Sequence, residues 1–233
     1  MKLNHFLTLA ALGVAVDAHY IFNILIVNDQ TVGGEYDYFR RNSNSYNPAF
    51  PDIVTTEDLR CNVGARAGNT QTYEVNAGDK IGFKLFNREF IEHPGPGFVY
   101  MSKAPDSVAT YDGSGDWFKV YEEGLCGGSP GNDGSWCSWQ KDRLEYTIPE
   151  NIPPGEYLVR VEHIGLHEGF QGRAQFYIEC AQLKINGPGG GTPAPLVKIP
   201  GIYDANDPGI RYDKWSSSPA EYIMPGPAVW DGQ

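Results

Sequence analysis

Glycine and proline interrupt this sequence so often that only short elements fit between them. The chain has 28 glycines and 17 prolines among its 233 residues, and both residue types end helices and strands. The intervening runs are short, alternating or apolar, and rich in Val, Ile, Tyr and Phe, and no window carries an apolar helical stripe over three turns. The runs are Tyr20–Val27, Tyr73–Val75, Lys80–Phe86, Phe98–Met101, Phe118–Tyr121, Leu144–Ile148, Tyr157–Ile164 and Ala174–Ile185. This pattern predicts an all-β fold, an antiparallel β-sandwich of immunoglobulin-like or fibronectin type with long loops.

The first 18 residues have the pattern of a secretory signal peptide. Lys2 supplies a charged start, Phe6–Val16 is apolar, and Val16-Asp17-Ala18 offers small residues at a cleavage site. The alternative is a buried N-terminal strand. We therefore expect cleavage after Ala18, secretion to the extracellular space, and a single domain over residues 19–233 with no carbohydrate-binding module.

The charge of the chain disfavours two classes of partner. The formal net charge is −11 at pH 7, which argues against binding to nucleic acid or to an anionic membrane surface. After the N-terminal segment, no apolar run approaches the ~20 residues that a membrane span needs. We expect a soluble monomer that acts on a neutral polymer.

Export predicts that the four cysteines form disulfides rather than a metal site. Cys126 and Cys137 are the nearest neighbours in sequence and flank a glycine-rich loop, so we predict that they pair. This pairing leaves Cys61 for Cys180.

Cleavage after Ala18 would make His19 the N-terminal residue. It would then offer two nitrogen donors to one metal ion, its α-amine and its imidazole. The α-amine has a reference pKa of about 7.7–8, so a metal can displace its proton at modest cost. A tetragonal site of nitrogen ligands suits copper. The alternative is that cleavage falls before a histidine by chance.

A third nitrogen donor is needed, and His93 is the best candidate. It lies in the turn Glu92–Gly97, whose prolines and glycines can hold an imidazole still at the edge of a sandwich. The alternative is an ordinary exposed loop histidine.

A second group of polar residues lies near the C-terminal strands. His163 and His167 are four residues apart, and strand alternation places Gln175 and Tyr177 on one face. The histidine pair could bind zinc by spacing, but no partner motif accompanies it. The alternative for Tyr177 is a core tyrosine with its hydroxyl satisfied locally.

Several short motifs occur together in a specific order. They are His19 after the signal peptide, Cys61-Asn62, Val75–Asp79, His93–Pro96 with Val99-Tyr100, Pro154–Glu162, Leu166-His167, Ala174–Cys180, Ile199–Tyr203 and Asp207–Ile210. In this order and spacing the chain resembles the fungal copper-dependent lytic polysaccharide monooxygenases of auxiliary activity family nine, over essentially residues 19–232.

The resemblance implies a role for each matching residue. One copper ion would be held by the amine and ring of His19 together with His93, and Tyr177 would fill an axial position. His167 and Gln175 would form hydrogen bonds to the oxygen co-substrate and would count as catalytic. The family disulfide corresponds to Cys61–Cys180.

The resemblance also implies an activity and its partners. The expected reaction is oxidative cleavage of a β-1,4-linked polysaccharide, with cellulose favoured, at C1 and/or C4 of the sugar. It would use O2 or H2O2 and an external reductant such as cellobiose dehydrogenase or a small phenol. The copper would lie on a flat surface, where we predict that Tyr203, Tyr212, Tyr36 and Tyr38 stack on sugar rings.

Two features depart from the family pattern, and two rival functions remain. Arg173 stands where a glycine is usual, and His163 is an extra histidine that we expect not to bind metal.

One rival is a non-catalytic copper- or glycan-binding sandwich. The other is a glycoside hydrolase, which needs two carboxylates beside the cut bond. No such pair stands out, because Glu162 is more simply explained as a structural partner of Arg160.

Overall fold

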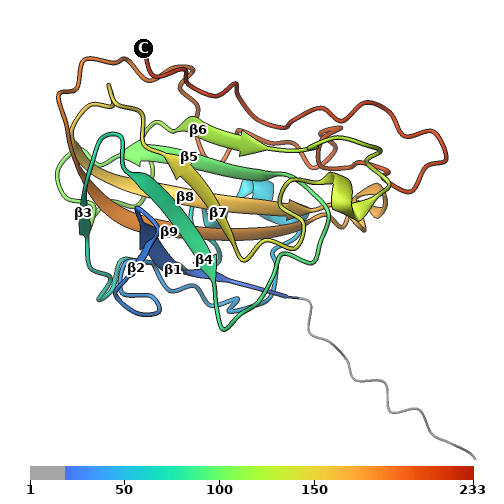
Figure 1. The fold of residues 1–233 in the computed structure, drawn as a ribbon, viewed down its shortest axis with the longest axis horizontal. Coiled ribbons are helices and arrows are strands. Elements are labelled where there is room, and N and C mark those ends of the chain that lie inside the picture. The colour runs from blue at the N-terminus through green and yellow to red at the C-terminus, as the bar shows by residue number, and fades with distance from the viewer. Residues whose placement is uncertain (1–18) are drawn as a thin grey trace, which may run out of the picture.

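Two β-sheets packed face to face form the body of the protein (Figure 1). This computed structural model describes residues 19–233, and the predicted signal peptide, residues 1–18, lies outside the described residues. One sheet has four strands in the order β2-β1-β4-β7 and the other has five in the order β3-β9-β8-β5-β6. The strands are β1 (Phe22–Val27), β2 (Gln30–Val32), β3 (Tyr73–Asn76), β4 (Lys80–Leu85), β5 (Gly97–Lys103), β6 (Phe118–Glu123), β7 (Arg143–Thr147), β8 (Gly155–Gly165) and β9 (Gln175–Asn186). The predicted β-sandwich is confirmed.

Strand β3 is the one exception to antiparallel pairing among the named strands. It runs parallel to β9, with Tyr73 opposite Leu183. A hairpin turn joins only antiparallel neighbours, whereas β3 follows the long connection formed by residues 33–72. That connection carries the chain from one sheet to the other, so β3 can enter beside β9 in the parallel sense.

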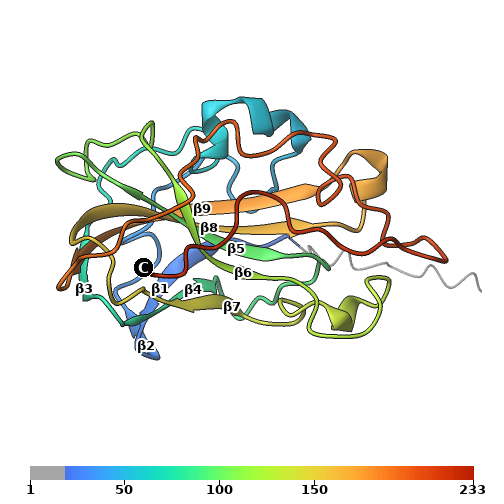
Figure 2. The ribbon, with the colours of Figure 1, turned by 90° about the horizontal axis from the view of Figure 1, so that it is seen from above.

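Apolar side chains fill two layers. The first lies between the sheets and includes Phe83, Tyr146 and Val161. The second lies on the outer face of the larger sheet and includes Trp117 and Phe176, which the long loops and the C-terminal tail cover. Figure 2 shows the tail, in red, crossing over this sheet. Because both faces are covered, β8 is buried almost throughout.

Helical structure among residues 19–233 is limited to four short 3-10 turns. They are η1 (Pro51–Thr55), η2 (Glu57–Leu59), η3 (Asp133–Ser135) and η4 (Gly169–Gln171). Across these residues we find no helix with the length and apolar character to cross a membrane.

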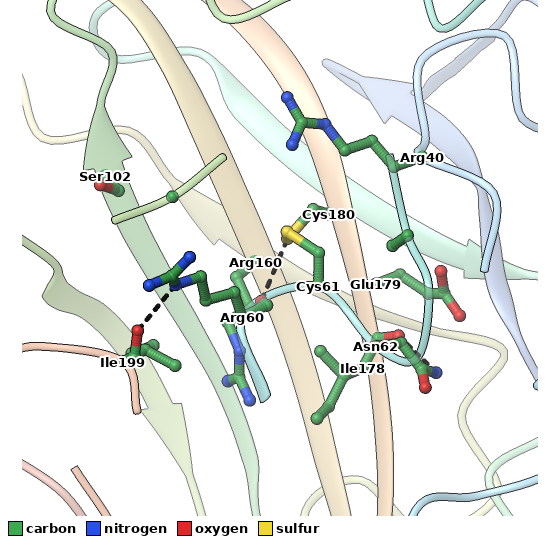
Figure 3. Close-up of a disulfide and its surroundings, with 12 residues drawn as sticks. Arg40, Arg60, Cys61, Asn62, Ser102, Arg160, Ile178, Glu179, Cys180 and Ile199 are labelled. Carbon is green, nitrogen blue, oxygen red and sulfur yellow. Dashed lines mark hydrogen bonds between the residues drawn. A yellow bond between two sulfur atoms is a disulfide. The ribbon is translucent and has the colours of Figure 1, made fainter. Parts of the chain in front are cut away.

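Both predicted disulfides are present, and no described cysteine is free. The Cα atoms of Cys61 and Cys180 are 5.2 Å apart, and those of Cys126 and Cys137 are 5.1 Å apart. The first link joins β9 to the segment after η2 (Figure 3). The second closes the loop that contains η3.

Candidate metal centre and its surroundings

The turn that carries His93 is fixed against the end of β8. The amide of Leu166 donates to the carbonyl of Pro94 over 2.8 Å. Gly95 has a φ of +159°, and a Cβ at this position would lie only 1.8 Å from the carbonyl oxygen of Ile164. Only glycine allows this approach. The turn therefore holds the imidazole of His93 at one edge of the larger sheet.

Three aromatic rings meet at this edge. The ring centroid of His19, just before β1, lies 6.3 Å from that of His93. Tyr177 projects from β9, and its ring centroid lies 6.4 Å from His19 and 5.8 Å from His93. The beginnings of β1 and β9 lie at the same side of the sandwich as the turn that carries His93. Residues that are far apart in sequence are therefore brought together.

One ring nitrogen of His93 lacks a partner. Its Nε2 is buried and accepts or donates no hydrogen bond, while a hydrogen bond to the backbone of Glu92 engages the other nitrogen. Burial, helped by the nearby His167 and His19, lowers the pKa of His93 to about 3, so the ring is neutral at pH 7. Leaving a buried polar atom unsatisfied costs about 1–3 kcal/mol. A neutral imidazole with one free nitrogen is the form that binds a metal ion.

The other nitrogen ligands for a metal ion beside His93 would come from His19. No group of three or more His, Cys, Asp or Glu side chains that could hold a metal ion occurs within residues 19–233. Two imidazoles and one α-amine would nevertheless supply three nitrogen ligands, which is a donor set that suits copper. In the uncleaved chain the backbone nitrogen of His19 belongs to a peptide bond, so this fit depends on cleavage before His19.

Two further polar residues border the three rings. The ring of His167 stacks on that of His93 at a centroid distance of 4.2 Å, and its Nδ1 is buried without a hydrogen-bond partner. Gln175 begins β9, and its Oε1 accepts a hydrogen bond of 2.7 Å from the hydroxyl of Tyr177. Every residue predicted for the metal centre therefore lies in one cluster.

Comparisons with known proteins identify the family of the chain. Residues 19–222 match the model of Auxiliary Activity family 9 (formerly GH61). The chain belongs to this family. It is 48% identical to the AA9 family lytic polysaccharide monooxygenase G of Aspergillus tamarii over 238 residues, covering 100% of this chain and 72% of that protein. It is 46% identical to monooxygenase A of Aspergillus fumigatus, covering 100% of this chain and 83% of that protein.

Solved structures of AA9 enzymes share the fold. The extended catalytic domain of H. jecorina LPMO9A superposes with a TM-score of 0.82 at 27% identity, covering 92% of each chain. A cellulose-active polysaccharide monooxygenase from M. thermophila superposes with a TM-score of 0.78 at 30% identity, covering 92% of this chain and 100% of that one. This chain is therefore a lytic polysaccharide monooxygenase, a class of copper enzymes that cleave polysaccharides oxidatively.

His163 lies beside this AA9 centre, but both of its ring nitrogens are in use. Nδ1 is 2.8 Å from the hydroxyl of Tyr20, and Nε2 is 3.2 Å from Oγ of Ser138. The side chain is fully buried. A histidine with two protein partners has no nitrogen left for a metal, which agrees with the expectation that it is not a ligand.

Glu162 is a structural residue, as predicted. Arg160 donates to both of its carboxylate oxygens, over 2.7 and 2.8 Å, and both side chains are fully buried. The hydroxyl of Tyr203 donates to the same carboxylate over 2.7 Å, and that of Tyr100 lies 2.9 Å from the hydroxyl of Tyr203. This carboxylate has no access to a substrate.

The same network corrects the role predicted for Tyr203. Its side chain is 7% exposed and packs in the layer beneath the C-terminal tail. Tyr212 is 5% exposed, and its hydroxyl donates to the carbonyl of Ala220. Neither ring offers a face on which a sugar could stack, because the tail folds back over the sheet.

The two tyrosines of the early loop are also engaged elsewhere. The guanidinium of Arg41 lies 4.0 Å from the ring centre of Tyr36 and covers one of its faces. Tyr38 packs against Tyr73 on β3, and its carbonyl accepts from Gln182. Gln182 lies seven residues along β9 from Gln175, roughly 23 Å at about 3.3 Å per residue. Tyr38 is thus far from the metal centre.

Trp215 lies beside the site and is aromatic, but the sequence analysis did not propose it for substrate binding. It is 56% exposed, and its Nε1 donates to the carbonyl of His167 over 2.8 Å. The ammonium of Lys214 lies 3.6 Å from its ring centre. Lys214 is itself buried and is bound by Asp133 at 2.5 Å, so the loop closed by Cys126–Cys137 supports the ring. The polar run that follows, Ser216 to Ser218, was the available signal for an exposed tryptophan.

Arg173 lies at the surface near this edge. It is half exposed, and its Nε lies 3.4 Å from the carboxylate of Glu168. Its guanidinium also lies 5.1 Å from the ring centre of Phe50. The arginine therefore links the turn that contains η4 to the loop before η1, where a glycine would leave the two segments unconnected.

Proposed function

We propose that this AA9 protein, once cleaved before His19, binds one copper ion through the amine and ring of His19 and Nε2 of His93. The observation that carries the proposal is the buried, unpartnered Nε2 of His93, on a ring whose centroid lies 6.3 Å from that of His19. Membership of the family supports copper-dependent oxidative cleavage of a polysaccharide. Secretion, removal of residues 1–18, a single catalytic domain over 19–233 and a monomeric state are part of the same proposal.

The protein's own residues arrange the reaction. Bound copper would supply the redox chemistry that lets O2 or H2O2 oxidise C1 or C4 of the sugar, with electrons from an external reductant such as cellobiose dehydrogenase or a small phenol. Tyr177 closes the inner side of the centre with its buried ring. Gln175 is held in place by the Tyr177 hydroxyl. His167 presents its ring at the open side, where it can donate a hydrogen bond or a proton to the oxygen co-substrate.

We propose a β-1,4-glucan, cellulose first of all, as the substrate. Sugar rings have apolar CH faces that stack on flat aromatic side chains. Trp215 presents such a ring beside His167, and Lys214 fixes it from one face. The M. thermophila enzyme with a similar structure is described as cellulose-active. Trp215 therefore replaces Tyr203 and Tyr212 as the proposed platform for the polymer.

Product analysis tests this proposal. The mature protein is loaded with copper and incubated with cellulose and ascorbate, and the soluble products are identified by mass spectrometry. Aldonic acids or C4-ketosugars are expected, and only from the copper-loaded sample. Unmodified oligosaccharides alone would contradict the oxidative reaction.

Copper binding is measured separately from activity. We expect tight binding by the mature protein, which begins at His19, and loss of tight binding when one extra alanine precedes His19. The extended protein is a matched variant because its one added residue turns the His19 amine into a peptide nitrogen and leaves every side chain unchanged. Equal affinity of the two forms would contradict the assigned ligands.

A further inference from the structure

A second pocket, separate from the metal centre, is lined by three arginines. Its volume is about 410 Å³, and its charged lining consists of Arg40, Arg60, Arg66, Glu57 and Asp112. Three positive and two negative side chains leave one net positive charge, in a chain whose overall charge is −11. Figure 3 shows Arg40 and Arg60 on either side of the Cys61–Cys180 disulfide. Pockets of about 300–1,000 Å³ accommodate small ligands.

Arg40 is the unusual member of this group. Its side chain is only 3% exposed, although arginine is rarely buried without an anionic partner. Its Nε donates to Gln182, and its Nη2 donates to the carbonyls of Val108 and Tyr111 over 2.7 Å each. These acceptors are all neutral. No carboxylate lies within ion-pair distance of Arg40 among the described residues.

The remaining nitrogen of Arg40 faces the pocket. Nη1 makes none of the hydrogen bonds of this side chain, yet it is absent from the set of fully buried polar atoms without a partner. Nη1 therefore keeps some solvent contact, and Arg40 is one of the residues that line the pocket. Burial lowers the pKa of Arg40 to about 10, so the group remains charged at pH 7. Asp112, which is already paired with Arg60, supports this charge from beyond ion-pair distance. A buried cation that is only partly compensated is costly, and a bound anion would lower that cost.

The other two arginines differ in how far they are already neutralised. Arg60 forms ion pairs with Glu57 at 3.5 Å and with Asp112 at 3.4 Å. Arg66 is exposed at the rim, and its Nη1 donates to the carbonyl of Ala65. No carboxylate within residues 19–233 forms an ion pair with Arg66. Arg40 and Arg66 are thus the two cations that can receive an anion.

We propose that this pocket binds a small monocarboxylate of the sugar-acid class, with Arg40 Nη1 and Arg66 gripping the carboxylate. One net positive charge matches a single carboxylate better than a phosphate dianion. Guanidinium groups hold carboxylates through charge-assisted hydrogen bonds. The short side chains of Ala65, Ala67 and Ala109 leave room beside the arginines for a ring-sized body. The choice of a sugar as the body of the ligand rests on the polysaccharide function proposed above. The choice of a carboxylate rests only on the charged side chains that line the pocket.

The pocket is remote from the proposed metal centre. Arg40 is bonded to Gln182 on β9, seven residues from Gln175, which is roughly 23 Å at about 3.3 Å per residue along a strand. A ligand here would not touch the copper ligands. Binding can therefore be measured without reference to oxidation.

The first experiment measures affinity by calorimetry on the copper-free mature protein. Glucuronate is expected to bind and glucose is not, because glucose lacks the carboxylate. Acetate should bind more weakly than glucuronate, and equal affinity would overturn the sugar-acid class. Tighter binding of inorganic phosphate would overturn the preference for a monoanion. Gluconate and an oligomer of galacturonate then distinguish a free acid from a polymer-borne one.

Location is tested on the copper-free protein, because sugar acids can themselves chelate copper. Glucuronate should shift the backbone amide resonances of residues 65–68 and 109–112. Shifts confined to residues near His19 and His93 would overturn the site.

Variants complete the test. R66Q should weaken glucuronate binding about 5- to 10-fold, since it removes one charge-assisted contact of roughly 1–1.4 kcal/mol. R88Q removes the same charge from an exposed position outside the pocket and should leave binding unchanged. R40K keeps the charge but shortens the grip, and should weaken binding at least as much as R66Q. If R40K fails to fold, the comparison of R66Q with R88Q still tests the site. Equal affinities of those two variants for glucuronate would overturn the proposal.

Discussion

Strand β8 connects two polar clusters whose hydrogen bonding differs. In its middle, Arg160 and Glu162 are fully buried and satisfy each other through two short hydrogen bonds. Just beyond its end, His93 and His167 each keep a buried nitrogen without a partner. The first cluster is complete within the protein and so serves the fold. The second is incomplete within the protein, which is what a site waiting for an external group requires.

Breaking the complete cluster should have the largest effect. E162Q leaves the guanidinium of Arg160 buried without its counter-charge, and losing one partner of a buried pair costs about 3–5 kcal/mol. Denaturant unfolding should show this loss, whereas E150Q at an exposed position should show almost none. The folded fraction of E162Q should still bind copper. A stability change under 1 kcal/mol would contradict the structural role.

Changing the incomplete cluster should affect binding more than folding. H93Q removes one of the three proposed nitrogen ligands. We expect copper affinity to fall about 100-fold or more, or at least about 2.7 kcal/mol. Copper should raise the melting temperature of the mature protein, because a ligand stabilises the state that binds it, but it should barely raise that of H93Q. The copper-free melting temperatures of the two proteins should be similar. Unchanged copper affinity would remove His93 from the centre.

A smaller effect is expected at the surface beside the metal centre. W215A removes one stacking platform, which we expect to weaken cellulose binding about 5-fold, or ~1 kcal/mol. Copper affinity should not change. L196A removes an exposed apolar side chain elsewhere and is the matched control. Pull-down of the protein with cellulose measures both, and equal losses would show that the effect is not specific to the ring.

The smallest effect should come from the support beneath that ring. D133N weakens the hold on Lys214, which packs against Trp215. We expect cellulose binding to fall about 2-fold, close to 0.4 kcal/mol. The fluorescence anisotropy of the protein should fall as the indole gains freedom, and it should not fall in E150Q. If D133N binds cellulose as tightly as the parent protein, the loop closed by Cys126–Cys137 has no part in substrate binding.

The sequence predicted most strands because their alternation and their glycine and proline boundaries are local features. It did not predict β2, Gln30–Val32, which is only three residues long and begins with two exposed polar residues. It also did not predict the parallel entry of β3, since the direction of a strand after a long loop depends on tertiary packing. The resemblance carried by the short motifs, and no local feature of the residues, predicted that His19, His93, His167, Gln175 and Tyr177 share one centre.

The exposed ring proposed as the substrate platform was harder to predict, for a physical reason. Tyr203, Tyr212 and Trp215 all lie in the same tail rich in proline and glycine. Apart from the serines that follow Trp215, nothing local distinguishes a covered ring from an exposed one. Tyr203 is drawn inward by the carboxylate of Glu162, from a strand some forty residues earlier. Trp215 is held outward by Lys214 and Asp133. Only the folded chain brings these partners together.

The two disulfides have different consequences for how long such an enzyme works among reducing agents. Cys61 and Cys180 are almost wholly shielded from solvent, so a thiol in the medium reaches that link poorly. Cys126 is exposed and Cys137 is partly exposed, so the second link is the one that opens first. Since its loop carries Asp133, prolonged use should erode the grip on the polymer before it disturbs the copper ligands. Inactivation of this kind would leave an enzyme that still binds copper but binds its substrate more weakly.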